Sequence, residues 1–253
     1  MTVGPFELLL LAAAGFASGW VNVLAGGGSI FTVPVMVFLG LPGPVANGTN
    51  RIAIIAQNIT AVGEFFRRGH SDFRLSATLA ATASLGAYFG ARVGVDLEGE
   101  AFNRTVAAVL IGVAILMALG EEKPKGAQAG ASPSPAKNLV LGHLLMIAAG
   151  FWGGFIQIGV GFLMMPILHR VMGLDLVRTN MHKVFIALVF SVVALAVFAS
   201  EVEIAWIAGA ALAAGNALGG YAGAHAAITR GAGLIKFAFY AMIAAMAAKL
   251  LFF

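Results

Sequence analysis

The stretch LAGGGSIFTVPVMVFLG, residues 24–40, interrupts an apolar chain with three consecutive glycines and then stays apolar for only a short distance. The apolar segment behind this break, Ser29–Leu41, has 13 residues, and a second segment of equal length, Val160–Met172, begins at the break Gly159–Gly161. A helix of that length rises about 20 Å, less than the roughly 30 Å of a bilayer's hydrocarbon core. Unwound backbone at that depth is tolerated only where protein or a watery cavity surrounds it. Each break therefore predicts a helix followed by a short broken or re-entrant half-helix.

The composition places these segments in a membrane. Of the 253 residues, 60% are hydrophobic and 10% are charged, whereas a soluble domain carries about 25% charged residues. The remaining apolar runs approach the length of about 20 residues that a spanning helix needs. No basic residue precedes the first run, which begins at Phe6, so we expect a retained membrane segment rather than a cleaved signal peptide. The predicted fold class is an all-α polytopic membrane protein.

One polar stretch divides the chain into two halves. Residues 121–138, EEKPKGAQAGASPSPAKN, are rich in proline, alanine, glycine and charge, a composition typical of a flexible linker. We predict a first membrane repeat over residues 1–120, a cytoplasmic linker over 121–138 and a second membrane repeat over 139–253. Each repeat contains about five apolar segments.

The two halves carry similar short sequences in the same order. The corresponding stretches are 15–22 and 150–157, Pro34 and Pro166, Thr49-Asn50 and Thr179-Asn180, and 85–92 and 218–225. An odd number of segments in each half turns the second half upside down in the membrane. The sequence therefore predicts two inverted repeats, a recurring design of secondary transporters.

The distribution of the basic residues between the two predicted sides predicts the orientation. One predicted side collects Arg67, Arg68, Arg74, Lys123, Lys125, Lys137, Arg170, Arg178, Lys183, Arg230 and Lys236, and the other has only Arg51, Arg92, Arg104 and Lys249. The side richer in lysine and arginine faces the cytoplasm in membrane proteins. We therefore expect both termini to be extracytoplasmic.

The glycine breaks are candidate anion sites. A half-helix that starts inside the membrane presents free N–H groups and the positive end of its dipole, which attract an anion without a charged side chain. Asn22 and Gln157 precede the two breaks, and Ser29 follows the first. Two half-helices that enter from opposite sides would converge on one substrate near the centre. The alternative is that the glycines serve only close helix packing.

The Thr-Asn pairs behind the half-helices each lead to a cation. Thr49-Asn50-Arg51 occupies one half and Thr179-Asn180-Met181-His182-Lys183 the other. The cations could bind an anion, or the threonines and asparagines could be N-caps with snorkelling cations beside them. The predicted substrate-binding residues are Asn22, Gly26, Gly27, Gly28, Ser29, Thr49, Asn50, Arg51, Gln57, Gln157, Gly159, Gly161, Thr179, Asn180, His182 and Lys183.

The sequence gives no sign of an enzyme. It has no cysteine, no nucleophile elbow, no phosphate-binding loop and no zinc-binding helix motif, so we expect no catalytic residue, metal site or cofactor. The expected partners are a small anionic substrate and the lipid bilayer, without nucleic acid. A coupling proton or ion and the oligomeric state stay open. An anion channel on the same scaffold and a structural membrane subunit are the competing interpretations.

The order of these motifs resembles one known family. Ala25–Ser29, AGGGS, followed by Pro34 and by Gly48-Thr49-Asn50-Arg51, is similar to the sulfite exporter TauE/SafE family. The resemblance implies transport of sulfite, sulfoacetate or other organosulfonates across a prokaryotic plasma membrane, commonly as export and in some members as uptake. The chain departs from a perfect duplication at Gly159-Val160-Gly161, which lacks the serine of the first break. We expect an exporter that works by alternating access, with a channel or an uptake permease for another small organic anion as the alternative.

Overall fold

The computed structural model describes residues 4–97, 99–102, 104–105, 108 and 135–252, which form helices without a strand. Most of the apolar segment 104–119 and most of the predicted linker 121–138 lie outside the described residues. The helices are α1 (Pro5–Ala25), α2 (Ser29–Phe38), α3 (Gly43–Arg67), α4 (Phe73–Gly94), α6 (Leu139–Phe155), α7 (Val160–Pro166), the π-helical turn η1 (Ile167–Val171), α8 (Leu176–Glu201) and α9 (Trp206–Phe252).

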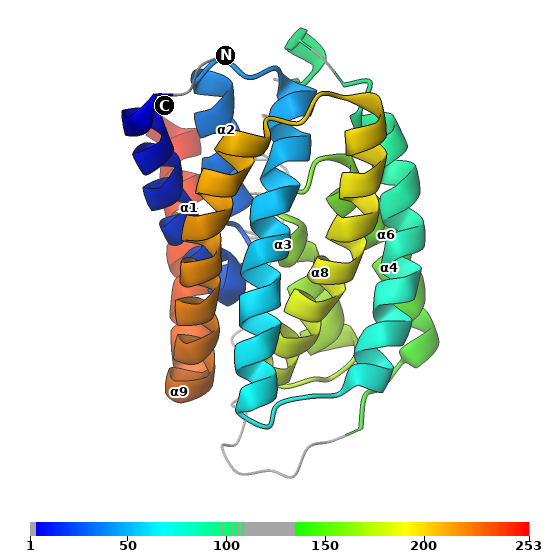
Figure 1. Ribbon diagram of the computed structural model, residues 1–253. Coiled ribbons are helices and arrows are strands. Elements are labelled where there is room, and N and C mark those ends of the chain that lie inside the picture. Colours follow the sequence, from blue (N-terminus) through cyan, green and yellow to red (C-terminus); the bar gives the residue numbers. More distant parts are fainter. Residues whose placement is uncertain (1–3, 98, 103, 106–107, 109–134, 253) are drawn as a thin grey trace.

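The first glycine break forms a hairpin. α1 ends at Ala25 and is capped by Gly26, which adopts a left-handed backbone with φ +87°, and α2 begins at Ser29. Figure 1 shows α1 running inward from the end of the molecule where both termini lie, and α2 returning toward that end. α2 is therefore re-entrant.

The second break forms a matching hairpin from the opposite end. α6 gives way to α7 around Gly159, where φ is +74°. The Nδ2 of Asn138, just before α6, donates to the carbonyl of Val171 at 2.9 Å, and the backbone N–H of Lys137 donates to Met172 at 2.9 Å. The hairpin thus returns to the level at which it starts, on the end away from the termini in Figure 1.

Helices of one half pack mainly on helices of the other. α1 lies along α9, and α6 lies along α4, while α3 and α8 contact each other and pack on α9 and α4 respectively. Glycines make these contacts close: a Cβ atom on Gly150 would lie 1.9 Å from the carbonyl oxygen of Ala83, and one on Gly15 would lie 2.4 Å from that of Leu212. The duplicated sequences 15–22 and 150–157 therefore include glycines that serve close helix packing.

α9 contains a reversal. Gly231 has φ +62° and ψ −156° within the helical stretch, and Figure 1 shows the segments on its two sides running in opposite directions. The positive φ suits glycine, which has no Cβ to clash. The reversal brings the C-terminus to the same end of the molecule as the N-terminus.

The outer surface of the bundle is apolar. Phe38 is 90% exposed, Val140 77% and Phe6 75%. Among the described helices, α1 and α8 are long and apolar enough to cross a bilayer, with mean hydropathies of 1.8 and 2.4. Such an exposed apolar surface suits contact with lipid.

Candidate functional site

The two breaks touch each other at the centre of the bundle. A Cβ atom on Gly26 would lie 2.5 Å from the Cα of Gly161, and one on Gly161 would lie 2.3 Å from the Cα of Gly26. No side chain could fit between the two backbones, because carbon atoms in ordinary contact are about 3.5–4.0 Å apart. The hairpin tips therefore cross in direct backbone contact.

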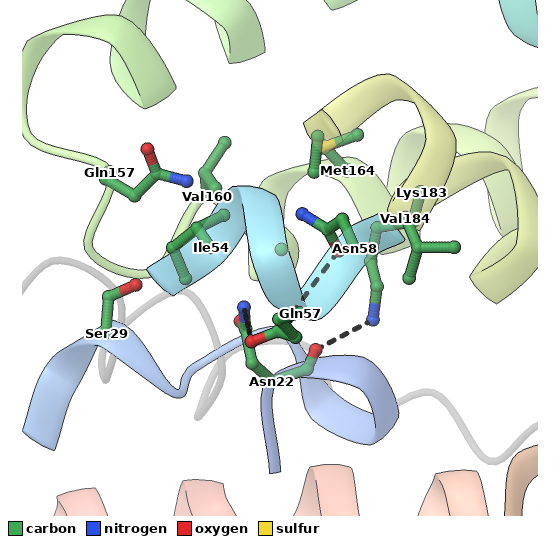
Figure 2. Close-up of a pocket in the computed structure, with 13 residues that line it drawn as sticks. Asn22, Ser29, Ile54, Gln57, Asn58, Gln157, Val160, Met164, Lys183 and Val184 are labelled. Carbon is green, nitrogen blue, oxygen red and sulfur yellow. Dashed lines mark hydrogen bonds between the residues drawn. The ribbon is translucent and has the colours of Figure 1, made fainter. Parts of the chain in front are cut away.

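A small pocket lies beside this crossing (Figure 2). Its lining residues come from both hairpins and from α3 and α8: Asn22, Gly26, Ser29, Ile54, Gln57, Asn58, Gln157, Val160, Gly161, Met164, Lys183, Val184 and Ala187. The cavity has a volume of about 20 Å³, room for one water molecule. A larger ligand would require the surrounding helices to separate.

Three amide side chains form a hydrogen-bonded row along one wall. The Nδ2 of Asn22 donates to Oε1 of Gln57 at 3.2 Å, and Nε2 of Gln57 donates to Oδ1 of Asn58 at 3.3 Å. The row ends on Nδ2 of Asn58, which has no partner in the described part of the chain although the residue is 1% exposed. A buried donor without an acceptor is costly, so this N–H group is available to a ligand.

Lys183 contributes the positive charge of the pocket. Its Nζ donates to the carbonyls of Asn22 at 3.2 Å and Val23 at 2.7 Å, at the C-terminal end of α1. A cation is stabilised there by the negative end of the helix dipole. The described lining contains no carboxylate, so the pocket favours an anion over a cation.

Arg51 supports the other hairpin and lies outside the pocket. Its Nη1 donates to the carbonyl of Gly153 at 3.0 Å and to Oε1 of Gln157 at 2.8 Å, and its Nη2 donates to the carbonyl of Gly154. The guanidinium also lies over the ring of Phe198, 4.5 Å from the ring centroid. Arg51 of the first half thus caps α6 of the second half, just as Lys183 of the second half caps α1 of the first.

Gln157 holds the second break in an unusual conformation. Its φ of +62° lies in the left-handed region, which residues other than glycine rarely adopt. Its side chain accepts from Arg51 and donates to Oγ of Ser191 at 3.3 Å. These bonds offset the backbone strain and keep the residue beside the pocket.

The structure contradicts the alternative interpretation of the Thr-Asn pairs, in which they are N-caps beside snorkelling cations. Thr49 and Asn50 are not N-caps, because α3 begins at Gly43 after Pro42, and α8 is capped by Asp175, whose Oδ1 accepts from the N–H groups of Val177 and Arg178 at 3.0 Å. The cations do not snorkel either. Arg51 is 0% and Lys183 3% exposed, so neither is a loop charge.

The structure divides the predicted site residues into two groups. Those that line the pocket are Asn22, Gly26, Ser29, Gln57, Gln157, Gly161 and Lys183. Those outside its lining are Gly27, Gly28, Thr49, Asn50, Arg51, Gly159, Thr179, Asn180 and His182. In the second group Thr49 Oγ1 accepts from the N–H of Ala205 at 3.1 Å, and Asn50 Oδ1 accepts from Thr32 Oγ1 at 2.7 Å.

Several lining residues were not predicted. The polar one is Asn58, which lies beside Gln57 inside an apolar run, and that position was its only signal in the sequence. The apolar ones are Ile54, Val160, Met164, Val184 and Ala187. No pattern in the sequence separates these apolar side chains from the rest of the core.

Residues 11–250 match the protein family described as Sulfite exporter TauE/SafE. The chain belongs to this family. It is therefore a membrane protein of a transporter family, and the central pocket is its candidate transport site. The duplicated glycine breaks that carried the resemblance are the two hairpin tips that meet beside that pocket.

Curated relatives of this TauE/SafE protein come from several bacteria. The Sinorhizobium sp protein "Probable membrane transporter protein ORF9" is 27% identical, over 97% of this chain and 93% of its own length. A "Probable membrane transporter protein" of Haemophilus influenzae is 24% identical, over 100% and 97%. "Probable membrane transporter protein YfcA" of Escherichia coli is 24% identical, over 99% and 91%. No solved structure matches the chain.

Proposed function

We propose that this TauE/SafE protein is a secondary transporter that exports small sulfur-containing anions, such as sulfite or short organosulfonates, across a bacterial plasma membrane by alternating access. The observation that carries the proposal is the pocket at the hairpin crossing. It combines the cation of Lys183 with the unpartnered N–H of Asn58 and has no carboxylate in its described lining.

The donor set suits a sulfonate or sulfite group. Such a group presents several acceptor oxygens around one sulfur atom, and the pocket offers donors from Lys183, Asn58 and Ser29 on three different helices. One cation with several dipoles also permits release. A buried anion between two or more cations would be held too tightly, because charge-assisted hydrogen bonds are about twice as strong as neutral ones.

The arrangement of the two hairpins supports an alternating mechanism. The two hairpins enter from opposite ends, and each tip is held by a cation from the other half. The pocket of about 20 Å³ is too small for a sulfonate, so binding requires the tips to move relative to α3 and α8. Movement of one hairpin would open the pocket to one side of the membrane while the other hairpin keeps it closed to the opposite side, as expected for inverted repeats around a fixed site.

Removal of the Asn58 amide tests the site. Asn58→Ala removes the unpartnered Nδ2 and also the acceptor of Gln57 Nε2, so it should lower stability by about 1–3 kcal/mol. It should weaken binding of sulfite and methanesulfonate about tenfold, the effect of one hydrogen bond to a charged group. Binding is measured as a ligand-dependent thermal shift and as uptake of labelled anion by proteoliposomes. The control is Asn216→Ala, which also removes a fully buried amide with an unpaired atom, on α9 outside the pocket lining.

The results separate the candidate functions. Equal affinity in wild type and Asn58→Ala would remove the site assignment. Currents that rise without saturation as the anion concentration increases would indicate a channel. No response to any anion in a panel would indicate a structural subunit.

The orientation of the inverted repeats can be tested because the chain contains no native cysteine. Both termini lie at one end of the molecule, and the connection between α3 and α4, with Arg67, Arg68 and Arg74, lies at the other. We expect a membrane-impermeant maleimide to label Gly4→Cys in intact cells and to label Ser71→Cys only after permeabilisation. The reverse labelling would place the termini in the cytoplasm and overturn the assignment from charge.

A further inference from the structure

A buried histidine outside the central pocket has an incomplete set of partners. His182 on α8 is 0% exposed, and its Nδ1 lies 2.8 Å from Oγ of Ser76 on α4. Its Nε2 is buried and has no partner among the described residues. In either neutral tautomer, one ring nitrogen therefore lacks the hydrogen bond that a buried polar group normally makes.

Ser76 connects this histidine to a second cavity. The cavity has a volume of about 10 Å³ and lies where α3 connects to α4. Its lining residues are Val62, Phe65, Phe66, His70, Ser71, Asp72, Phe73, Ser76, Met181 and Phe185. Its polar lining residues differ in exposure: Ser71 is exposed, His70 and Asp72 are half-buried, and Ser76 is buried. Water in such a cavity, together with its hydroxyl and imidazole groups, can carry a proton from the exposed residues to Ser76.

The charges around His182 come from two helices. Asp72 caps the start of α4 and lies 3.6 Å from Arg178 in the first turn of α8, measured from Oδ2 to Nη2. The charged groups that act on His182 electrostatically are Asp72 at the start of α4 and Asp175 and Arg178 at the start of α8, and Lys183 follows it in the chain. His70 is the other titratable residue among those that line the second cavity. Asp72 acts on His182 from outside α8, and it also lines the second cavity.

We propose that His182 binds the proton in a proton-coupled anion transport, and that the proton reaches it from the second cavity through Ser76. The inference rests on the proposed function, since it assigns the coupling ion of the same transporter. In the transfer, a hydronium ion in the cavity gives a proton to Ser76 Oγ and becomes water, while the Ser76 hydroxyl passes its own proton to Nδ1. One O–H bond of hydronium and the original O–H bond of Ser76 break, a new O–H bond and an Nδ1–H bond form, and the imidazole becomes a cation with two N–H donors.

The position of His182 supplies the coupling. It directly precedes Lys183, whose Nζ lies at the central pocket and holds the tip of α1. A proton on His182 adds positive charge next to Lys183 without bringing a second cation into contact with the anion, because His182 lies outside the pocket lining. A bound anion offsets that charge. The anion and the proton therefore favour each other's binding by the same factor, which is the reciprocity required of coupled sites. The expected result is movement of one proton with each monovalent anion in the same direction.

Methanesulfonate is the probe, because it remains an anion over the working pH range and cannot itself carry a proton through the lipid. Proteoliposomes that contain a pH-sensitive dye receive a methanesulfonate gradient without a pH gradient. Wild type should acidify the compartment that the anion enters, with about one proton per anion. His182→Gln should retain exchange of labelled methanesulfonate and reduce the accompanying proton movement at least tenfold, because glutamine can still bond to Ser76 but cannot be protonated.

The control is His143→Gln near the start of α6, a histidine whose one side-chain hydrogen bond among the described residues is to the carbonyl of Leu139, and it should keep full coupling. Ser76→Ala should retain anion exchange and slow proton movement. Anion movement by wild type without acidification, or full coupling in His182→Gln, would overturn this inference and leave the proposed function intact. Absence of methanesulfonate movement in wild type would overturn both. If His182→Gln does not fold, wild type and Ser76→Ala still decide the outcome.

Discussion

Gly161→Ala is expected to abolish anion transport and to destabilise the protein. The added Cβ would lie 2.3 Å from the Cα and 2.6 Å from the carbonyl oxygen of Gly26, and both atoms belong to the backbone of the other hairpin. A backbone cannot rotate away as a flexible side chain can, so the hairpin tips must separate by more than an ångström. Overpacking of this kind costs about 1–3 kcal/mol. If that cost applies to the state in which the pocket is closed around the anion, the affinity for the anion falls roughly 10- to 100-fold.

The measurement combines thermal unfolding in detergent with uptake by proteoliposomes. Gly63→Ala is a matched control, because this glycine lies inside α3 with no atom within 4 Å of its Cβ position. Alanine has the higher helix propensity, so this variant should be as stable as wild type or slightly more so. Normal transport in Gly161→Ala would mean that the tips do not touch during the transport cycle.

Arg51→Met should be the most destabilising substitution on α3. The variant leaves the carbonyls of Gly153 and Gly154 and the side chain of Gln157 without their shared donor in a fully buried place. Each unsatisfied buried group costs about 1–3 kcal/mol, so we expect a loss of at least about 3 kcal/mol and a large fall in unfolding temperature. Arg51→Lys should recover only part of the loss, because an ammonium lacks the planar fork that reaches these acceptors together.

Arg92→Met provides the comparison for Arg51. Arg92 also lies near an aromatic ring and pairs with Glu201 at 3.1 Å, but its side chain is 54% exposed, so its removal should leave the unfolding temperature nearly unchanged. An Arg51→Met protein as stable as wild type would also be informative. If Arg51→Met unfolds like wild type but no longer binds anions, Arg51 contacts the substrate directly, as its place in the sequence motif suggested.

The hairpins illustrate what the sequence could predict. Segment length and consecutive glycines are local properties, and they correctly placed two half-helices behind Gly26 and Gly159. The same sequence left open whether the half-helices span the membrane or return. That choice depends on contacts such as those of Asn138 and Lys137 with Val171 and Met172, which join residues more than thirty positions apart.

Roles of the polar side chains were harder to predict than their presence. Arg51 and Lys183 occupy similar positions in the two halves, yet only Lys183 lines the central pocket. Which cation faces the pocket depends on how α3 and α8 are rotated against the two hairpins, and rotation of a helix leaves no mark in a largely apolar sequence. Asn58 differs from Gln57 in one respect that only the structure reveals: its amide nitrogen has no partner within the described chain.

The packing of α1 on α9 and of α6 on α4 bears on how the chain is made. During synthesis, the glycine face of α1 is complete at Ala25, but its packing partner begins only at Trp206. At about 5–20 residues per second, roughly ten to forty seconds pass before the ribosome supplies that partner. Through this interval the newborn first half holds α1 against lipid or against the insertion machinery. Biogenesis of the first hairpin therefore ends in a late exchange, in which α9 displaces the temporary neighbours of α1, whereas α6 finds its partner α4 already made.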